Sequence, residues 1–252
     1  MNKHLTSLLA LTALTFTCAM AQGVKKADTQ QSGTILYGVN GFGEIITYIA
    51  DDAVRIKYPV AGLNVLCKKP TYEVIWFNPP AKSIMRESLA QYRARSGMPP
   101  KEREMRKMRQ SEVNFSGFLA NRVTVSESAK NDFVLPSMGT GRRAMMTATN
   151  FYILKGIDTE PTLQIFLNTC SNFPKLGGIP LGRTHNYADS TISTDFKYTR
   201  IEKSKMPRGI FDVPTGYKAV FSQPDVARGP GYQKQFDDLA RGMGLGEKFG
   251  KK

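Results

Sequence analysis

The feature that most constrains this 252-residue chain is a series of short segments in which apolar and polar side chains alternate. In one of them Val54, Ile56 and Tyr58 alternate with Arg55 and Lys57. Successive side chains of a β-strand point to opposite faces, so a period of two predicts a strand with one buried face. Strands are expected over residues 34–37, 44–49, 53–58, 63–67, 72–77, 82–85, 115–126, 144–154 and 192–201.

One segment has the helical period instead. Within residues 160–172, Leu163, Phe166, Leu167 and Cys170 recur at the spacing that places them on one helix face. Two further helical segments, over residues 86–92 and 101–110, are expected inside a basic insert over residues 86–112. The order of strands, basic insert, strands, helix and strands predicts an α+β fold, with a strongly curved antiparallel sheet and helices covering one face.

The first 21 residues resemble a secretory signal peptide. A positive start is followed by an apolar stretch over residues 5–17 and then by Ala19-Met20-Ala21, which has small residues where a signal peptidase needs them. We therefore expect cleavage after Ala21 and a periplasmic or extracellular protein. The remaining chain divides into a flexible linker over residues 22–33, one domain over residues 34–223 and a basic, glycine-rich tail over residues 224–252.

Export would place Cys67 and Cys170, the two cysteines left after the leader, in an oxidising compartment. They can pair as a disulfide in an oxidising compartment or remain buried free thiols, and both alternatives stay open. His185 is the one histidine outside the leader, which excludes sites that need two or three histidines. We expect no catalytic centre, metal or cofactor, and a hydrolase that uses a cysteine with His185 ranks last among the alternatives.

Residues 178–181 (Gly-Ile-Pro-Leu) and 210–218 (IFDVPTGYK) frame a long strand and resemble the ending of the LolA-like, DUF4412-type family of secreted periplasmic proteins of uncharacterised function. The resemblance covers residues 33–221. It implies a half-open β-barrel with helices across its concave face, where the lipoprotein-carrier relatives hold acyl chains. Apolar side chains expected either to line such a cavity or to pack as solid core are Trp76, Phe77, Phe151, Ile153, Leu163, Phe166 and Leu167.

The charge balance suggests a second kind of partner. The formal net charge is +14, and residues 82–109 hold nine basic and three acidic side chains. This insert is either a solvated helical face or a surface for anionic phospholipid or an acidic partner, with Arg103, Arg106, Lys107 and Arg109 as candidates. Export and the lack of a recognised motif argue against nucleic acid. The leading hypothesis is a non-enzymatic exported protein that binds a lipid or other apolar ligand between sheet and helices, and binding through residues 86–112 is the alternative.

Overall fold

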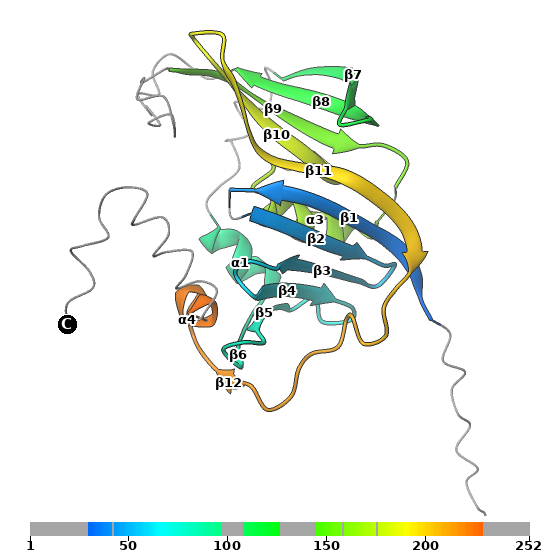
Figure 1. The fold of residues 1–252 in the computed structure, drawn as a ribbon, viewed down its shortest axis with the longest axis vertical. Coiled ribbons are helices and arrows are strands. Elements are labelled where there is room, and N and C mark those ends of the chain that lie inside the picture. The colour runs from blue at the N-terminus through cyan, green and yellow to red at the C-terminus, as the bar shows by residue number, and fades with distance from the viewer. Residues whose placement is uncertain are drawn as a thin grey trace, which may run out of the picture.

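The computed structural model describes residues 30–41, 43–96, 108–126, 145–157, 159–174 and 176–228. Within them, twelve strands form one open, curved sheet in the order β12-β6-β5-β4-β3-β2-β1-β11-β10-β9-β8-β7 (Figure 1). The strands are β1 (Ser32–Asn40), β2 (Gly43–Ile49), β3 (Ala53–Tyr58), β4 (Leu63–Lys68), β5 (Val74–Asn78), β6 (Ser83–Glu87), β7 (Arg109–Phe115), β8 (Phe118–Ser126), β9 (Met146–Leu154), β10 (Ile179–Tyr187), β11 (Ile192–Lys205) and β12 (Lys218–Ala219). The helices are α1 (Leu89–Arg95), α3 (Pro161–Cys170) and α4 (Gln223–Ala227).

Strand pairing joins the two ends of the domain. β1 pairs with the late strand β11, so residues near 35 and near 200 lie side by side, and every neighbouring pair is antiparallel except β12 with β6. The predicted α+β class is wrong, because the described residues form mostly β-strands and only three short helices. The antiparallel, curved sheet is as expected. None of these helices is long and apolar enough to cross a membrane.

The main core lies on one face of the sheet, which we call the inner face. All three helices contribute to it, through Tyr92 of α1, Leu163 and Phe166 of α3 and Val226 of α4. Their partners are the strand residues on the inner face, which include Leu36, Val54, Ile56, Val65, Cys67 and Trp76. Alternation along each strand thus sends one set of side chains toward the helices, as the period of two predicts.

The opposite, outer face is also covered, over β1 to β6. After β11 the chain runs along the lower margin of the sheet to β12 and α4 (Figure 1), and we call residues 206–217 the strap. Phe211 of the strap packs against two outer-face clusters, one formed by Leu66, Ile75, Phe77 and Ile84 and the other by Ile35, Tyr48 and Met206 of the strap itself. The apolar residues of the IFDVPTGYK segment therefore seal the second face of the sheet.

Two segments differ from the expected secondary structure. Residues 109 and 110, expected at the end of a helix, begin β7, because pairing with β8 outweighs the high helix propensity of the basic insert. β10 was not expected at all, since Gly178, Pro180 and Gly182 disfavour strands. The register of β10 with β9 shifts between Pro180 and Gly182, so the proline falls at an irregularity where its missing N–H is tolerated.

The expected boundaries also move slightly. β1 starts at Ser32, inside the stretch expected as linker, and α4 extends to Ala227, inside the stretch expected as tail. Residues 1–21, the expected signal peptide, lie outside the described residues. So do most of the insert beyond Ser96 and the tail from residue 229 onward.

Candidate functional site

Helix α3 covers the apolar layer on the inner face of the sheet, where a ligand was expected to bind. The carboxylate of Glu160 accepts a hydrogen bond from the Leu163 backbone N–H at 3.0 Å, and Pro161 occupies the first turn, where its missing N–H costs nothing. The helix packs against β3, β4 and β10. Glycines with positive φ, Gly156 at +79° and Gly177 at +70°, precede and follow it.

Six of the seven expected lining residues come together in this layer. Trp76, Phe151, Ile153, Leu163, Phe166 and Leu167 belong to the inner core and are between 0% and 7% exposed. Phe77 does not join them. It follows Trp76 on β5, so it faces the other way and packs beneath the strap.

Aromatic rings fill much of the space between sheet and helices. Trp76 meets Tyr92 of α1 edge-on with centroids 5.5 Å apart, and Tyr92 in turn lies 6.3 Å from Phe166 of α3. A second series runs from Phe151 through Phe173 and Phe196 to Tyr198, with successive centroids 5.0 to 5.9 Å apart. In the state described, the layer is thus closed by its own side chains.

The hydroxyls and thiols of this layer are neutral, and two hydrogen bonds join four of them, while Asn168 Oδ1 on α3 is buried without a hydrogen-bond partner among the described residues. The hydroxyls of Tyr198 and Thr47 share a hydrogen bond of 2.5 Å, and the Tyr92 hydroxyl donates to Cys170 Sγ at 3.4 Å. Burial raises the pKa of both tyrosines and of Cys170, and it raises the pKa of the Cys67 thiol to about 12. Both cysteines are free thiols here. A thiol that stays protonated is a poor nucleophile, so these residues do not favour the hydrolase alternative.

His185 lies in a charged network with Asp195 and Arg183. Its Nε2 is 3.2 Å from Asp195 Oδ2, and its Nδ1 is 3.0 Å from Thr149 Oγ1. Arg183 donates to both Asp195 oxygens and to the backbone carbonyls of Ser171 and Asn172 just beyond α3. The network therefore attaches the end of α3 to β10 and β11, because those carbonyls have no partner inside the helix.

The same network has the order hydroxyl, imidazole, carboxylate that hydrolases use. Thr149, however, is only 5% exposed, so its hydroxyl is closed to a substrate. Burial opposes ionisation of Asp195, but hydrogen bonds from His185 and Arg183 outweigh it and lower the pKa of Asp195 to about 2. A carboxylate held in this way stabilises structure. Among the described residues there is also no group of three or more His, Cys, Asp or Glu side chains that could hold a metal ion.

Of the four basic residues predicted to contact an anionic surface, only one lies among the described residues. Arg103, Arg106 and Lys107 lie outside the described residues, while Arg109 is the exposed first residue of β7. Their role stays a prediction.

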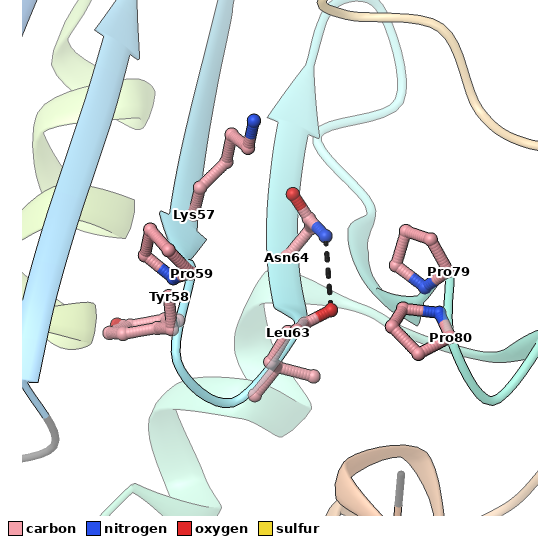
Figure 2. Close-up of a pocket in the computed structure, with 8 residues that line it drawn as sticks. Lys57, Tyr58, Pro59, Leu63, Asn64, Pro79 and Pro80 are labelled. Carbon is pink, nitrogen blue, oxygen red and sulfur yellow. Dashed lines mark hydrogen bonds between the residues drawn. The ribbon is translucent and has the colours of Figure 1, made fainter. Parts of the chain in front are cut away.

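Two surface depressions lie away from α3. One, of about 240 Å³, separates the β3–β4 turn from the β5–β6 turn; Figure 2 shows Leu63 and Asn64 on one side of it and Pro79 and Pro80 on the other. Of the described residues that line it, Lys57 alone is charged. The other, of about 430 Å³, lies beside β12 and α4 and includes Phe221, which is 97% exposed. Ser83 and Asp225 both line the second depression, but the Ser83 hydroxyl donates to the Val226 carbonyl at 3.1 Å and the Asp225 carboxylate accepts from Ser222, so they do not form a nucleophile–base pair.

No family model and no curated protein matches this chain. Among solved structures, an uncharacterised conserved protein from Thermus thermophilus is similar over 77% of this chain and 92% of its own, with a TM-score of 0.41 and 11% identity. The MucA/MucB complex of Pseudomonas aeruginosa is similar over 76% of this chain and 58% of that one, with a TM-score of 0.34 and 11% identity. A domain assigned as a putative outer membrane lipoprotein-sorting protein of Vibrio parahaemolyticus is similar over 72% and 88%, with a TM-score of 0.24 and 12% identity. All three scores lie below 0.5 and leave the function to be argued from this chain's own residues.

Proposed function

We propose that this chain is an exported, non-enzymatic protein that binds an acyl chain or similar apolar ligand between the inner face of the sheet and helix α3. One observation carries the proposal: a short helix with an apolar buried stripe lies directly on an apolar strand face and is flanked by glycines in the left-handed region. Glycine adopts positive φ without steric strain and has the widest backbone freedom, so Gly156 is a suitable hinge position before α3. Movement about Gly177 also breaks the hydrogen bonds of Arg183 to the Ser171 and Asn172 carbonyls, which lie between α3 and that glycine. A ligand enters when α3 lifts.

The chemistry of the layer fits this ligand class. Its walls are mostly aliphatic and aromatic, and its hydroxyls and thiols are already paired or neutral. An incoming polar group would therefore lose most of its hydrogen bonds to water without replacement, since Asn168 Oδ1 is the one buried acceptor of α3 without a partner among the described residues. An acyl chain makes no hydrogen bonds to water and therefore loses none when it enters the layer.

The energetics set a minimum ligand size. Burying a Leu or Phe side chain contributes about 1.5–3 kcal/mol, so lifting Leu163, Phe166 and Leu167 off the sheet costs roughly 5–9 kcal/mol. Each buried CH₂ of the ligand returns about 0.8 kcal/mol, and on the order of 6–11 buried methylenes are needed to offset that cost. Long acyl chains meet this requirement and short ones do not.

A chain-length series tests the proposal. Delipidated protein lacking residues 1–21 is titrated calorimetrically with hexanoate, decanoate, myristate and stearate. We expect no binding of hexanoate and saturable binding of myristate and stearate with a negative heat-capacity change. Absence of binding at every length, or equal affinity for all four, would refute an apolar site beneath α3.

A matched pair of variants locates the site. Leu167→Ala removes part of the contact that closes α3 and is expected to strengthen myristate binding, because less closure energy is lost. Leu119→Ala makes the same change at a side chain on β8 that is 54% exposed, and it should leave binding unchanged. Equal effects of both variants would place the ligand elsewhere.

The alternative, contact of residues 86–112 with anionic membranes, rests on the charge of the segment. Sedimentation with anionic liposomes tests it directly. Charge reversal at Arg103, Arg106, Lys107 and Arg109 should then abolish co-sedimentation.

A further inference from the structure

The two edges of the sheet differ sharply. At one end β12 contributes only Lys218 and Ala219. At the other end β7 is seven residues long, contains no proline and pairs with β8 without a register shift. Natural sheets commonly protect such edges with prolines, bulges or very short strands, and β7 has none of these devices.

The β7–β8 turn decides which backbone groups of β7 point outward. Ser116 and Gly117 both have positive φ, +53° and +87°, as a two-residue type I′ turn requires. In such a hairpin the flanking pair, Phe115 with Phe118, exchanges both hydrogen bonds, and hydrogen-bonded pairs then recur at every second residue. The N–H and C=O groups of residues 113, 111 and 109 therefore face β8. Those of Gln110, Glu112 and Asn114 point away from β8, toward the edge along which no strand of the described residues pairs, and we call this the free edge.

One face of β7 is both basic and apolar. Arg109, Ser111, Val113 and Phe115 alternate onto this face, together with Arg122 of β8, whose Nε donates to Ser111 Oγ at 3.2 Å. Neither guanidinium has a carboxylate partner among the described residues.

Two contacts hold the strand in place. Phe115 stacks on Tyr152 of β9 with ring centroids 3.8 Å apart, and it lies over Gly182 of β10, where any Cβ would come within 2.3 Å of the ring. On the other face the Glu112 carboxylate pairs with Lys155 at 2.7 Å. These contacts fix the orientation of the edge, and among the described residues no carboxylate pairs with the guanidiniums at its Arg109 end.

We propose that the free edge of β7 binds an extended acidic segment of a partner protein as an additional β-strand. The outward groups of Gln110, Glu112 and Asn114 supply the main-chain hydrogen bonds, as in other strand-addition complexes. Alternate side chains of the added strand lie beside Arg109 and Ser111 at one end and beside Val113 and Phe115 at the other. They are therefore acidic at the first end and apolar at the second. This site is separate from the layer beneath α3 and does not depend on it.

Charge favours a different protein over a second copy as the occupant. A twofold axis through the centre of β7 would place Glu112 opposite Glu112 of the second copy, and like charges directly opposite are destabilising. Two chains of formal charge +14 also repel each other. An acidic segment has neither difficulty.

Two peptides represent the proposed partner. Val-Thr-Val-Thr-Glu-Thr-Glu matches the antiparallel register, and its reversed sequence matches the parallel one. Versions with Lys in place of Glu are the charge controls. Fluorescence anisotropy should detect saturable binding of one acidic peptide at low salt, at least tenfold tighter than its Lys version. No binding of either acidic peptide, or equal binding of the Lys version, would overturn the proposal.

Substitutions at one position separate backbone from side chain. Glu112→Pro removes an outward N–H and should weaken the acidic peptide at least tenfold, while Glu112→Ala loses the same carboxylate and should bind like the wild type. Arg109→Glu should reverse the preference toward the Lys peptide. If Glu112→Pro binds as well as Glu112→Ala while both keep the wild-type circular dichroism, the strand does not add at this edge. Light scattering could instead detect a dimer of the wild type that Glu112→Pro dissociates. This result would mean that a second copy binds the edge, and it would likewise overturn the proposal.

Discussion

The guanidinium of Arg55 on β3 donates a hydrogen bond of 2.7 Å to the backbone carbonyl of Ile210, 155 residues later in the chain. The same guanidinium donates to Asn64 Oδ1 and lies 4.8 Å from the Phe77 ring centroid. Lys68 makes a similar bond to the Phe211 carbonyl at 3.3 Å. The strap is therefore fastened to the outer face by cations that bind main-chain oxygens, and its own side chains add apolar contacts.

Arg55→Ala should loosen the strap. Losing a half-buried guanidinium that serves two acceptors and a ring is expected to lower the free energy of unfolding by about 2–3 kcal/mol. Urea denaturation measures this loss, and limited proteolysis should show faster cleavage within residues 206–217.

Arg86→Ala is the matched control for that experiment. Arg86 makes a surface pair with Glu73, and such pairs contribute about 0–1 kcal/mol. Equal losses for Arg55→Ala and Arg86→Ala would show that the strap is not fastened through Arg55.

Leu167→Ala should destabilise the closed layer. Leu167 is 1% exposed in the inner core, and truncation of a buried Leu costs about 2–5 kcal/mol. The measurement is the urea midpoint without ligand, and saturating myristate should recover part of the loss because binding stabilises the folded state. A loss no greater than that of Leu119→Ala would mean that α3 does not pack as described.

Asp195 should make folding sensitive to acid. Its folded pKa is about 2, below its ordinary value near 4, so its contribution is complete above the ordinary value and disappears as pH falls through the folded pKa. The melting temperature should therefore drop between about pH 4 and pH 2. Asp195→Asn should flatten part of this drop, and an unchanged profile would contradict the pairing with Arg183 and His185.

The two cysteines should be unreactive in the folded protein. With the pKa of Cys67 raised to about 12 and that of Cys170 also raised, almost no thiolate exists at about pH 8. Iodoacetamide should label neither thiol in buffer and both in urea. Fast labelling of the folded protein would contradict the burial, whereas no labelling in urea without reductant would show that the exported protein carries the disulfide.

Proline substitutions should test the orientation of β7 independently of any ligand. Val113→Pro removes a hydrogen bond to β8, while Glu112→Pro removes only an N–H that points away from β8. We expect a clearly lower melting temperature for Val113→Pro than for Glu112→Pro. The reverse order would mean that the hydrogen-bonding alternation is shifted by one residue.

Local pattern was a good guide wherever neighbouring residues decide the structure. The alternation around Ile56 predicted β3 with its correct bounds, and the stripe of Leu163, Phe166 and Leu167 predicted α3 and its buried face. Phe77 was misplaced because a run of apolar residues does not reveal which of them face each side. Both faces of β5 are buried, one beneath the helices and one beneath the strap.

Pairs distant in the chain lay beyond local pattern. The bonds of His185 to Thr149 and Asp195 depend on the register of three strands, and β10 among them breaks the propensity rules at Pro180 and Gly182. Only the tertiary structure explains Gly182, because the Phe115 ring of β7 lies against it and leaves no room for a Cβ.

By itself, the sequence determined that the chain makes an antiparallel sheet with one face toward an apolar helix, because the side-chain period is set by residues only a few positions apart. Only the tertiary structure decided that the strap covers the outer face, that Arg183 anchors the end of α3 and that β7 is left with a free edge. Each of these depends on which distant segments meet, and that is settled by the combined burial of many side chains and not by any local preference.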